Sequence, residues 1–68
     1  MSRPIMAEVR RATAEAHILQ ALSYRAESRA YRLQGETDAA ARYERHAAKY
    51  VEMAKQYAAM AESLEASA

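Results

Sequence analysis

Small and apolar residues recur in alternating steps of three and four along both halves of the chain. In the first half the row is Ile5, Val9, Ala12, Ala16, Leu19, Ser23, Ala26, Ala30 and Leu33. In the second half the row is Ala40, Tyr43, Ala47, Tyr50, Ala54, Tyr57, Ala61 and Leu64. A seven-residue repeat of this kind is typical of α-helices that pack as a left-handed coil. The pattern predicts two helices whose contacting faces are these rows, named below the 5–33 stripe and the 40–64 seam.

The only proline and the only glycine of the chain mark the ends of the predicted helices. Ser2 is a favourable N-cap residue, and Pro4 is tolerated in the first turn of a helix. Gly35 is the residue type most common just past a helix end. Either Thr37 or Asp38 can cap the helix that follows.

These boundaries predict one all-α domain over residues 1–68. A helix is expected over about 3–34, a turn over 35–37 and a second helix over about 38–65. Because so short a connection makes the helices antiparallel neighbours, the chain is expected to form a coiled-coil-like helical hairpin. Reversal at residues 36 and 37 places Tyr43 opposite Ala30. Apart from Leu64 opposite Val9, large side chains then meet small ones, as close packing requires. The 5–33 stripe is expected to be buried against the 40–64 seam.

A hairpin of this composition has little apolar area to bury. Eighteen of its 68 residues are Ala, only eight are Ile, Val or Leu, and no cysteine is available for a disulfide. At roughly 25 cal/mol per Å² of buried apolar surface, such a monomer is weakly stabilised. We therefore expect two hairpins to pair into a dimeric four-helix bundle.

Two groups of residues lie outside the predicted rows, one on each side of the hairpin. The predicted dimer interface consists of Ile18, Leu22, Met53 and Met60. The predicted binding site for a partner protein consists of Arg10, His17, Tyr24 and Tyr31. Tyr and Arg are frequent at binding hot spots, and flexible Met side chains adapt to different surfaces. A partner groove is the alternative for the first group, and the edge of the bundle core is the alternative for the second.

Charge narrows the choice of partner. The net charge is only +1, which argues against bulk attraction to nucleic acid, but the first helix has a basic face. This predicted basic face consists of Arg11, Arg25, Arg29 and Arg32. A solvated helix face is its simplest interpretation, and contact with an acidic protein surface is the next. Nucleic acid comes last because no helix-turn-helix or other reader motif is present.

Residues that carry chemistry are few, and their spacing matches no catalytic or metal-binding motif. One glycine is too few for a phosphate loop, and without cysteine there is no thiol nucleophile or zinc–thiolate site. A bundle metal site pairs a Glu with a His three residues later, but Ala14 precedes His17 at that spacing. Tyr43 likewise precedes His46. We therefore expect no enzyme activity, no cofactor, no metal and no small-molecule substrate.

The chain also lacks the patterns of a membrane or secreted protein. No apolar run approaches the roughly 20 residues of a membrane span, and no apolar segment follows the basic N-terminus as in a signal peptide. The lack of cysteine fits a reducing compartment. We expect a cytoplasmic protein without a membrane partner.

One stretch has the spacing of a known family. Its small and aromatic positions are Tyr24, Ser28, Tyr31, Gly35, Ala40 and Ala47. They resemble a single tetratricopeptide repeat, whereas Glu27, Glu44 and Glu52 replace that family's large apolar, aromatic and proline positions. The resemblance implies helical-hairpin packing. It implies no peptide-binding function, because about three repeats are needed to bury a continuous core.

These observations predict a small homodimer that modulates or inhibits another protein by occluding part of its surface. Short chains without catalytic residues often act in this way, including those of phages and mobile elements, and a host regulator or ATPase is the expected kind of target. One alternative is a nucleic-acid-associated bundle that uses the arginine face of the first helix. Another is a structural subunit whose sides join copies in a larger assembly.

Overall fold

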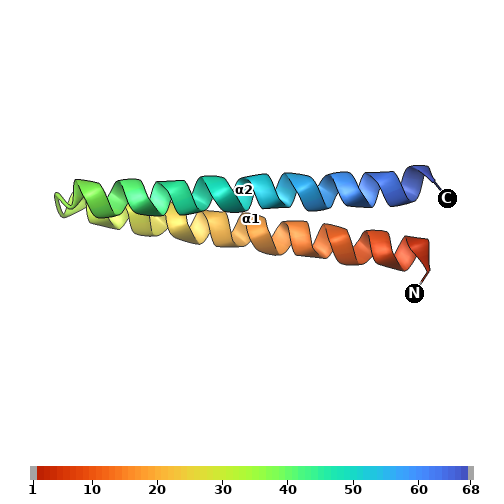
Figure 1. The fold of residues 1–68 in the computed structure, drawn as a ribbon. Helices are drawn as coiled ribbons and strands as arrows, with labels where there is room; N and C mark the ends of the chain where they lie inside the picture. The colour runs from red at the N-terminus through yellow and green to blue at the C-terminus, as the bar shows by residue number, and fades with distance from the viewer. Residues whose placement is uncertain (1, 68) are drawn as a thin grey trace.

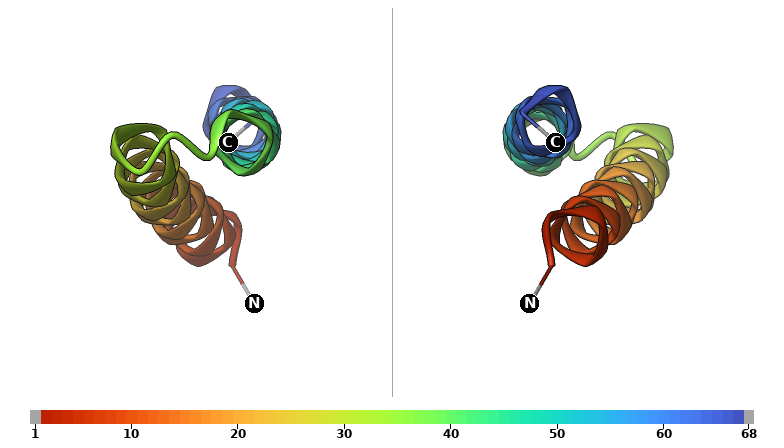
Figure 2. Two further views of the ribbon diagram at one scale, coloured as in Figure 1. Left: turned by 90° about the vertical axis from the view of Figure 1, so that its left-hand side faces the viewer. Right: turned by 90° about the vertical axis from the view of Figure 1, so that its right-hand side faces the viewer.

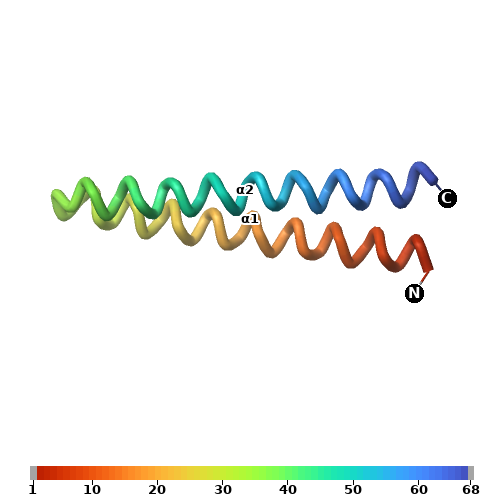
Figure 3. The backbone as a smooth tube through the Cα atoms, in the orientation of Figure 1, coloured from red at the N-terminus to blue at the C-terminus, as the bar shows by residue number. Residues whose placement is uncertain are grey.

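Two long antiparallel helices joined by a tight turn make up the protein (Figure 1). The computed structural model describes residues 2–67. Helix α1 spans Arg3–Leu33 and helix α2 spans Thr37–Ala66. The start of α1 and the end of α2 lie at the same end of a rod about 51 Å long (Figure 3). The predicted all-α hairpin is therefore confirmed, whereas the pairing of two hairpins into a bundle stays a prediction.

Helix α1 begins as its sequence indicates. The Ser2 hydroxyl oxygen accepts a hydrogen bond from the backbone N–H of Ile5 at 3.4 Å, and the proline lies in the first turn. At the other end of the molecule, Gly35 has a φ of 80°, a left-handed conformation that glycine adopts without strain. The Gly35 N–H donates to the Arg32 carbonyl at 3.0 Å, and the turn is complete.

The start of α2 differs from the prediction by one residue. Glu36 is the N-cap residue, and its side chain makes no capping hydrogen bond. Thr37 is already helical, because the left-handed glycine reverses the chain so quickly that only three residues, 34–36, separate Thr37 from the end of α1 at Leu33. The prediction of Thr37 or Asp38 as the cap is wrong. Asp38 instead lies in the first turn, where a negative charge interacts favourably with the helix dipole.

The contacting face of α2 is the predicted one. Every alanine of the 40–64 seam is buried, and its larger residues are half-buried between them. The contacting face of α1 is different. Leu19 is 67% exposed and Leu33 is 80% exposed, so the prediction that the 5–33 stripe packs against α2 is wrong.

Two other seven-residue series of α1 face α2. The alanine series is Ala7, Ala14, Ala21 and Ser28, and the ring series is Arg10, His17, Tyr24 and Tyr31. Members of the first series are buried or half-buried, and members of the second are half-buried. Because each residue turns a helix by about 100°, α1 is rotated by roughly half a turn from the predicted orientation. Seen along the long axis, it is also inclined to α2 (Figure 2).

Small residues and rings explain this choice of face. The buried alanines allow the two backbones to approach closely, and the rings of α1 then reach the tyrosines of α2. Aromatic pairs contribute about 0.5–1.5 kcal/mol beyond the area that they bury. Packing the 5–33 stripe against α2 would forgo these ring contacts.

Candidate protein-interaction surfaces

Rings from the two helices alternate along one side of the hairpin. Successive ring centroids are 5.3–5.8 Å apart. The order along this aromatic zipper is Tyr31, Tyr43, Tyr24, Tyr50, His17 and Tyr57. The guanidinium of Arg10 lies over the Tyr57 ring, 5.8 Å from its centroid, and ends the row with a cation–π contact.

The end of the zipper near the turn has a distinct electrostatic environment. The His46 ring lies 5.3 Å from that of Tyr24 and 5.9 Å from that of Tyr43. The phenol of Tyr31, and after it the Glu27 carboxylate, raise the pKa of the Tyr43 hydroxyl above its ordinary value, although Arg42 acts in the opposite direction. This hydroxyl therefore stays protonated to higher pH than a free tyrosine.

The side of the hairpin opposite the zipper is built from small residues and ion pairs. The buried Ser28 hydroxyl donates a hydrogen bond to the Ala40 carbonyl at 2.8 Å. Arg11 pairs with Glu65, and Arg32 pairs with Glu44 at 3.1 Å. Between these two pairs lies a shallow groove of about 620 Å³, whose apolar lining includes Ile18, Val51 and Ala58.

The predicted partner-binding residues do not lie where the sequence interpretation placed them. The predicted rows leave Arg10, His17, Tyr24 and Tyr31 outside the helix contact. The structure places all of them in the helix contact, against the tyrosines of α2. They stay half-buried, so one edge of the zipper reaches the surface. Their role in binding a partner stays a proposal.

The predicted dimer-interface residues are divided between the two sides. Ile18 lines the groove, and Leu22, 52% exposed, lies one helical turn further along α1. Met53 and Met60 follow His46 at intervals of seven. Because His46 contacts the zipper, this row lies on the zipper side. The rotation of α1 separates the two pairs, so the four residues form no single patch.

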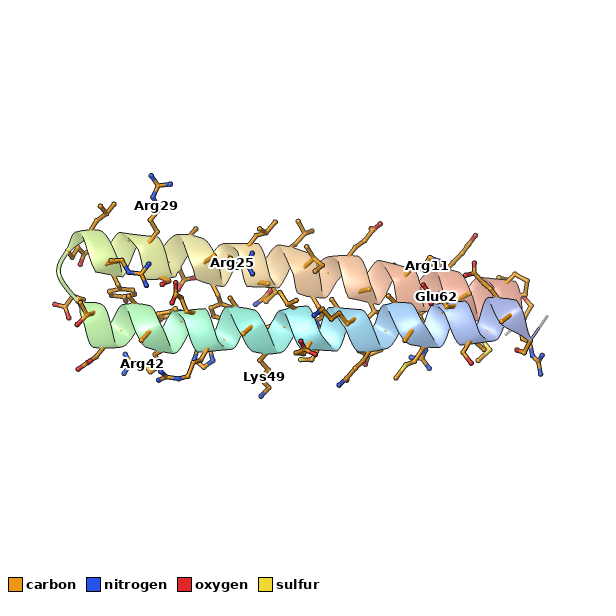
Figure 4. The ribbon with its side chains drawn as sticks, turned by 90° about the horizontal axis from the view of Figure 1, so that it is seen from above. Arg11, Arg25, Arg29, Arg42, Lys49 and Glu62 are labelled. Atoms are coloured by element: carbon orange, nitrogen blue, oxygen red, sulfur yellow. The ribbon has the colours of Figure 1, made fainter. Side chains whose placement is uncertain are left out.

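The predicted basic face is also divided. Arg11 and Arg32 are engaged in the ion pairs described above, on the groove side. Arg25 lies seven residues before Arg32 and therefore on the same side of α1. Arg29 points away from α2 (Figure 4). Part of the positive charge of this face is therefore neutralised within the hairpin.

The 5–33 stripe, predicted to be buried, is exposed along α1. It contains no charged residue, and its aliphatic side chains are 44–80% exposed. The outward face of α2 is polar, and its Arg42 and Lys49 side chains point away from α1 (Figure 4). Helix α1 therefore has two apolar faces, of which α2 covers one.

Comparisons with protein-family models, with curated proteins and with solved structures found no match. Within residues 2–67, no three His, Cys, Asp or Glu side chains gather as a metal site requires. Neither helix, over the part of the chain that the structure describes, combines the length and apolar character of a membrane span.

Proposed function

We propose that this protein is a non-enzymatic, cytosolic helical protein that self-associates and binds another protein, whose activity it modulates by occlusion. The observation that supports the proposal is the exposed 5–33 stripe. Soluble monomers rarely expose long contiguous apolar patches, and such patches mark interaction sites. A seven-residue period in the stripe favours another helix as the covering element.

The zipper side is the proposed site for the other protein. The tyrosines on this side are half-buried and carry hydroxyl groups, and Met53 and Met60 lie on the same side of α2 with adaptable side chains. A rod about 51 Å long has the reach to cover a helix or cleft of a larger protein. A host regulator or ATPase targeted by a phage or mobile element is the kind of partner proposed.

The alternatives of nucleic-acid binding and of an open structural assembly receive less support. Two of the four arginines of the basic face already pair with glutamates, which lowers the charge available to phosphates. The polar outward face of α2 offers no second apolar row with which copies would continue a chain.

The test is affinity capture from the native cell followed by titration of the captured protein with purified variants. Met53→Gln with Met60→Gln changes the proposed site and leaves the rings in place. Gln56→Ala with Ser63→Ala on the outward face of α2 is the matched control. Saturable binding that weakens at least tenfold with the methionine variant alone supports the proposal. Equal binding by both variants overturns the site, and the absence of any saturable partner overturns protein binding.

A further inference from the structure

We infer that the 5–33 stripe of one chain packs antiparallel against the 5–33 stripe of a second copy. The inference rests on the self-association in the proposed function and adds the face and the register. Facing positions have numbers that add up to 35. The facing pairs are Ile5 with Ala30, Val9 with Ala26, Ala12 with Ser23, and Ala16 with Leu19.

Shape complementarity selects this arrangement. In every facing pair between two members of the stripe that contains a large side chain, the opposite residue is alanine, so these layers interdigitate without voids; Leu33 faces position 2, beyond the end of the stripe. A two-fold axis repeats each pair, as an isologous dimer requires. In a parallel, in-register arrangement Leu19 would instead meet Leu19, and layers of two large residues would alternate with layers of two alanines.

Charge complementarity favours the same arrangement. Glu8 and Arg29 flank the stripe on one side and are both exposed. Within residues 2–67, neither forms an ion pair inside the hairpin. Antiparallel packing brings Arg29 of one copy next to Glu8 of the other, twice in the dimer. Arg29 already points away from α2, toward the side from which the second copy would approach (Figure 4).

The other faces of the molecule fit the stripe less well. The stripe follows nearly the whole of α1, which is about 45 Å long at 1.5 Å per residue, so its complement must be a helix face of similar length. The 40–64 seam is already covered, and the outward face of α2 carries Arg42, Arg45, Lys49 and Glu52. A second 5–33 stripe is the uncharged row of matching length and period on this molecule.

Disulfide trapping tests the register directly, because the natural chain has no cysteine. Ala12→Cys and Ser23→Cys are made as separate proteins; both positions are exposed, so the hairpin is expected to fold normally. Mixing them under mild oxidation is expected to give the mixed disulfide dimer. Each protein alone is expected to stay largely uncross-linked, since like positions lie about 16 Å apart along the axis in this register. As a control, Lys49→Cys is mixed with Gln56→Cys, both on the outward face of α2, and the rate at which they form a disulfide gives the rate of random collision.

The cysteine variants are first checked by circular dichroism, which must show the same helicity as the natural protein. A mixed disulfide formed at least tenfold faster than the α2 control supports the inference. Efficient disulfides from Ala12→Cys alone indicate parallel packing and overturn it. A dimer by light scattering without the mixed disulfide overturns the face and register, but leaves self-association in place. A monomer at all concentrations overturns both the inference and the self-association in the proposed function.

Discussion

Truncation of Tyr24 tests whether the rings of α1 belong to the helix contact. Tyr24 contacts more rings than Tyr31, since its centroid lies 5.8, 5.5 and 5.3 Å from those of Tyr43, Tyr50 and His46. Removing a fully buried large aromatic side chain destabilises a protein by about 3–5 kcal/mol. Because Tyr24 is half-buried, Tyr24→Ala is expected to lower the free energy of unfolding by about 2–3 kcal/mol.

Two comparison variants separate the ring contacts from other effects. Tyr31→Ala removes a ring at the end of the zipper, which contacts Tyr43 at 5.3 Å, and is expected to lower the free energy of unfolding by about 1 kcal/mol. Tyr24→Phe keeps the ring and is expected to change this free energy by less than about 1 kcal/mol.

The assay is urea denaturation followed by far-UV circular dichroism. All variants are compared at the same protein concentration, because self-association shifts apparent stability. If Tyr24→Ala is no more destabilising than Tyr31→Ala, the zipper does not stabilise the hairpin and the described helix contact is wrong.

Three further predictions concern the zipper and the turn. Folding raises the pKa of Tyr43, so its contribution to stability is present below about pH 10, the ordinary pKa of tyrosine, and is lost as the pH rises through the higher folded-state pKa. Urea titrations at increasing pH should show a shallower fall for Tyr43→Phe, and identical profiles would contradict this. Ser28→Ala removes the hydrogen bond to Ala40 and should destabilise the hairpin by about 1 kcal/mol in urea titrations. The bulkier Ser28→Val should destabilise it by about 1–3 kcal/mol, because the helices are in close contact there. The reverse order of the two variants would contradict this close contact. Gly35→Ala should lower the free energy of unfolding by about 1 kcal/mol, and with it the thermal midpoint, because a φ of 80° is unfavourable for alanine. Steric overlap adds nothing to this cost, since an added Cβ would meet no atom within 4 Å. An unchanged midpoint would show that the turn tolerates side chains.

The sequence was sufficient to predict the helices, the turn and one of the two contacting faces. Glycine chemistry located the turn, and the 40–64 seam was predictable because alanine and tyrosine alternate in α2 on a single row. The start of α2 was missed by one residue, because a capping preference does not reveal how quickly a left-handed glycine reverses the chain.

The contacting face of α1 was not predictable from periodicity alone. The 5–33 stripe and the alanine and ring series both repeat every seven residues, so each satisfies the pattern of a helix contact. The stripe has the more hydrophobic side chains, which made it the natural choice for the core. What favours the alanine and ring series as the contacting face is the pairing between rings of different helices. The shared seven-residue spacing of His17, Tyr24 and Tyr31 was the available signal for that pairing.

The most direct test of the central claim is the molar mass of the protein in solution, measured by light scattering over a range of concentrations. Leu19→Glu changes an exposed residue at the middle of the 5–33 stripe, and Gln56→Glu is its control on α2. Loss of two Leu19 contacts is expected to weaken the dimer by about 3 kcal/mol, or more than a hundredfold in Kd. Pairing through the 5–33 stripe predicts twice the mass of one chain for the natural protein and for Gln56→Glu. It predicts the mass of one chain for Leu19→Glu, with unchanged helicity. A natural protein that stays monomeric, or a Leu19→Glu variant that dimerises as tightly as the control, would contradict it.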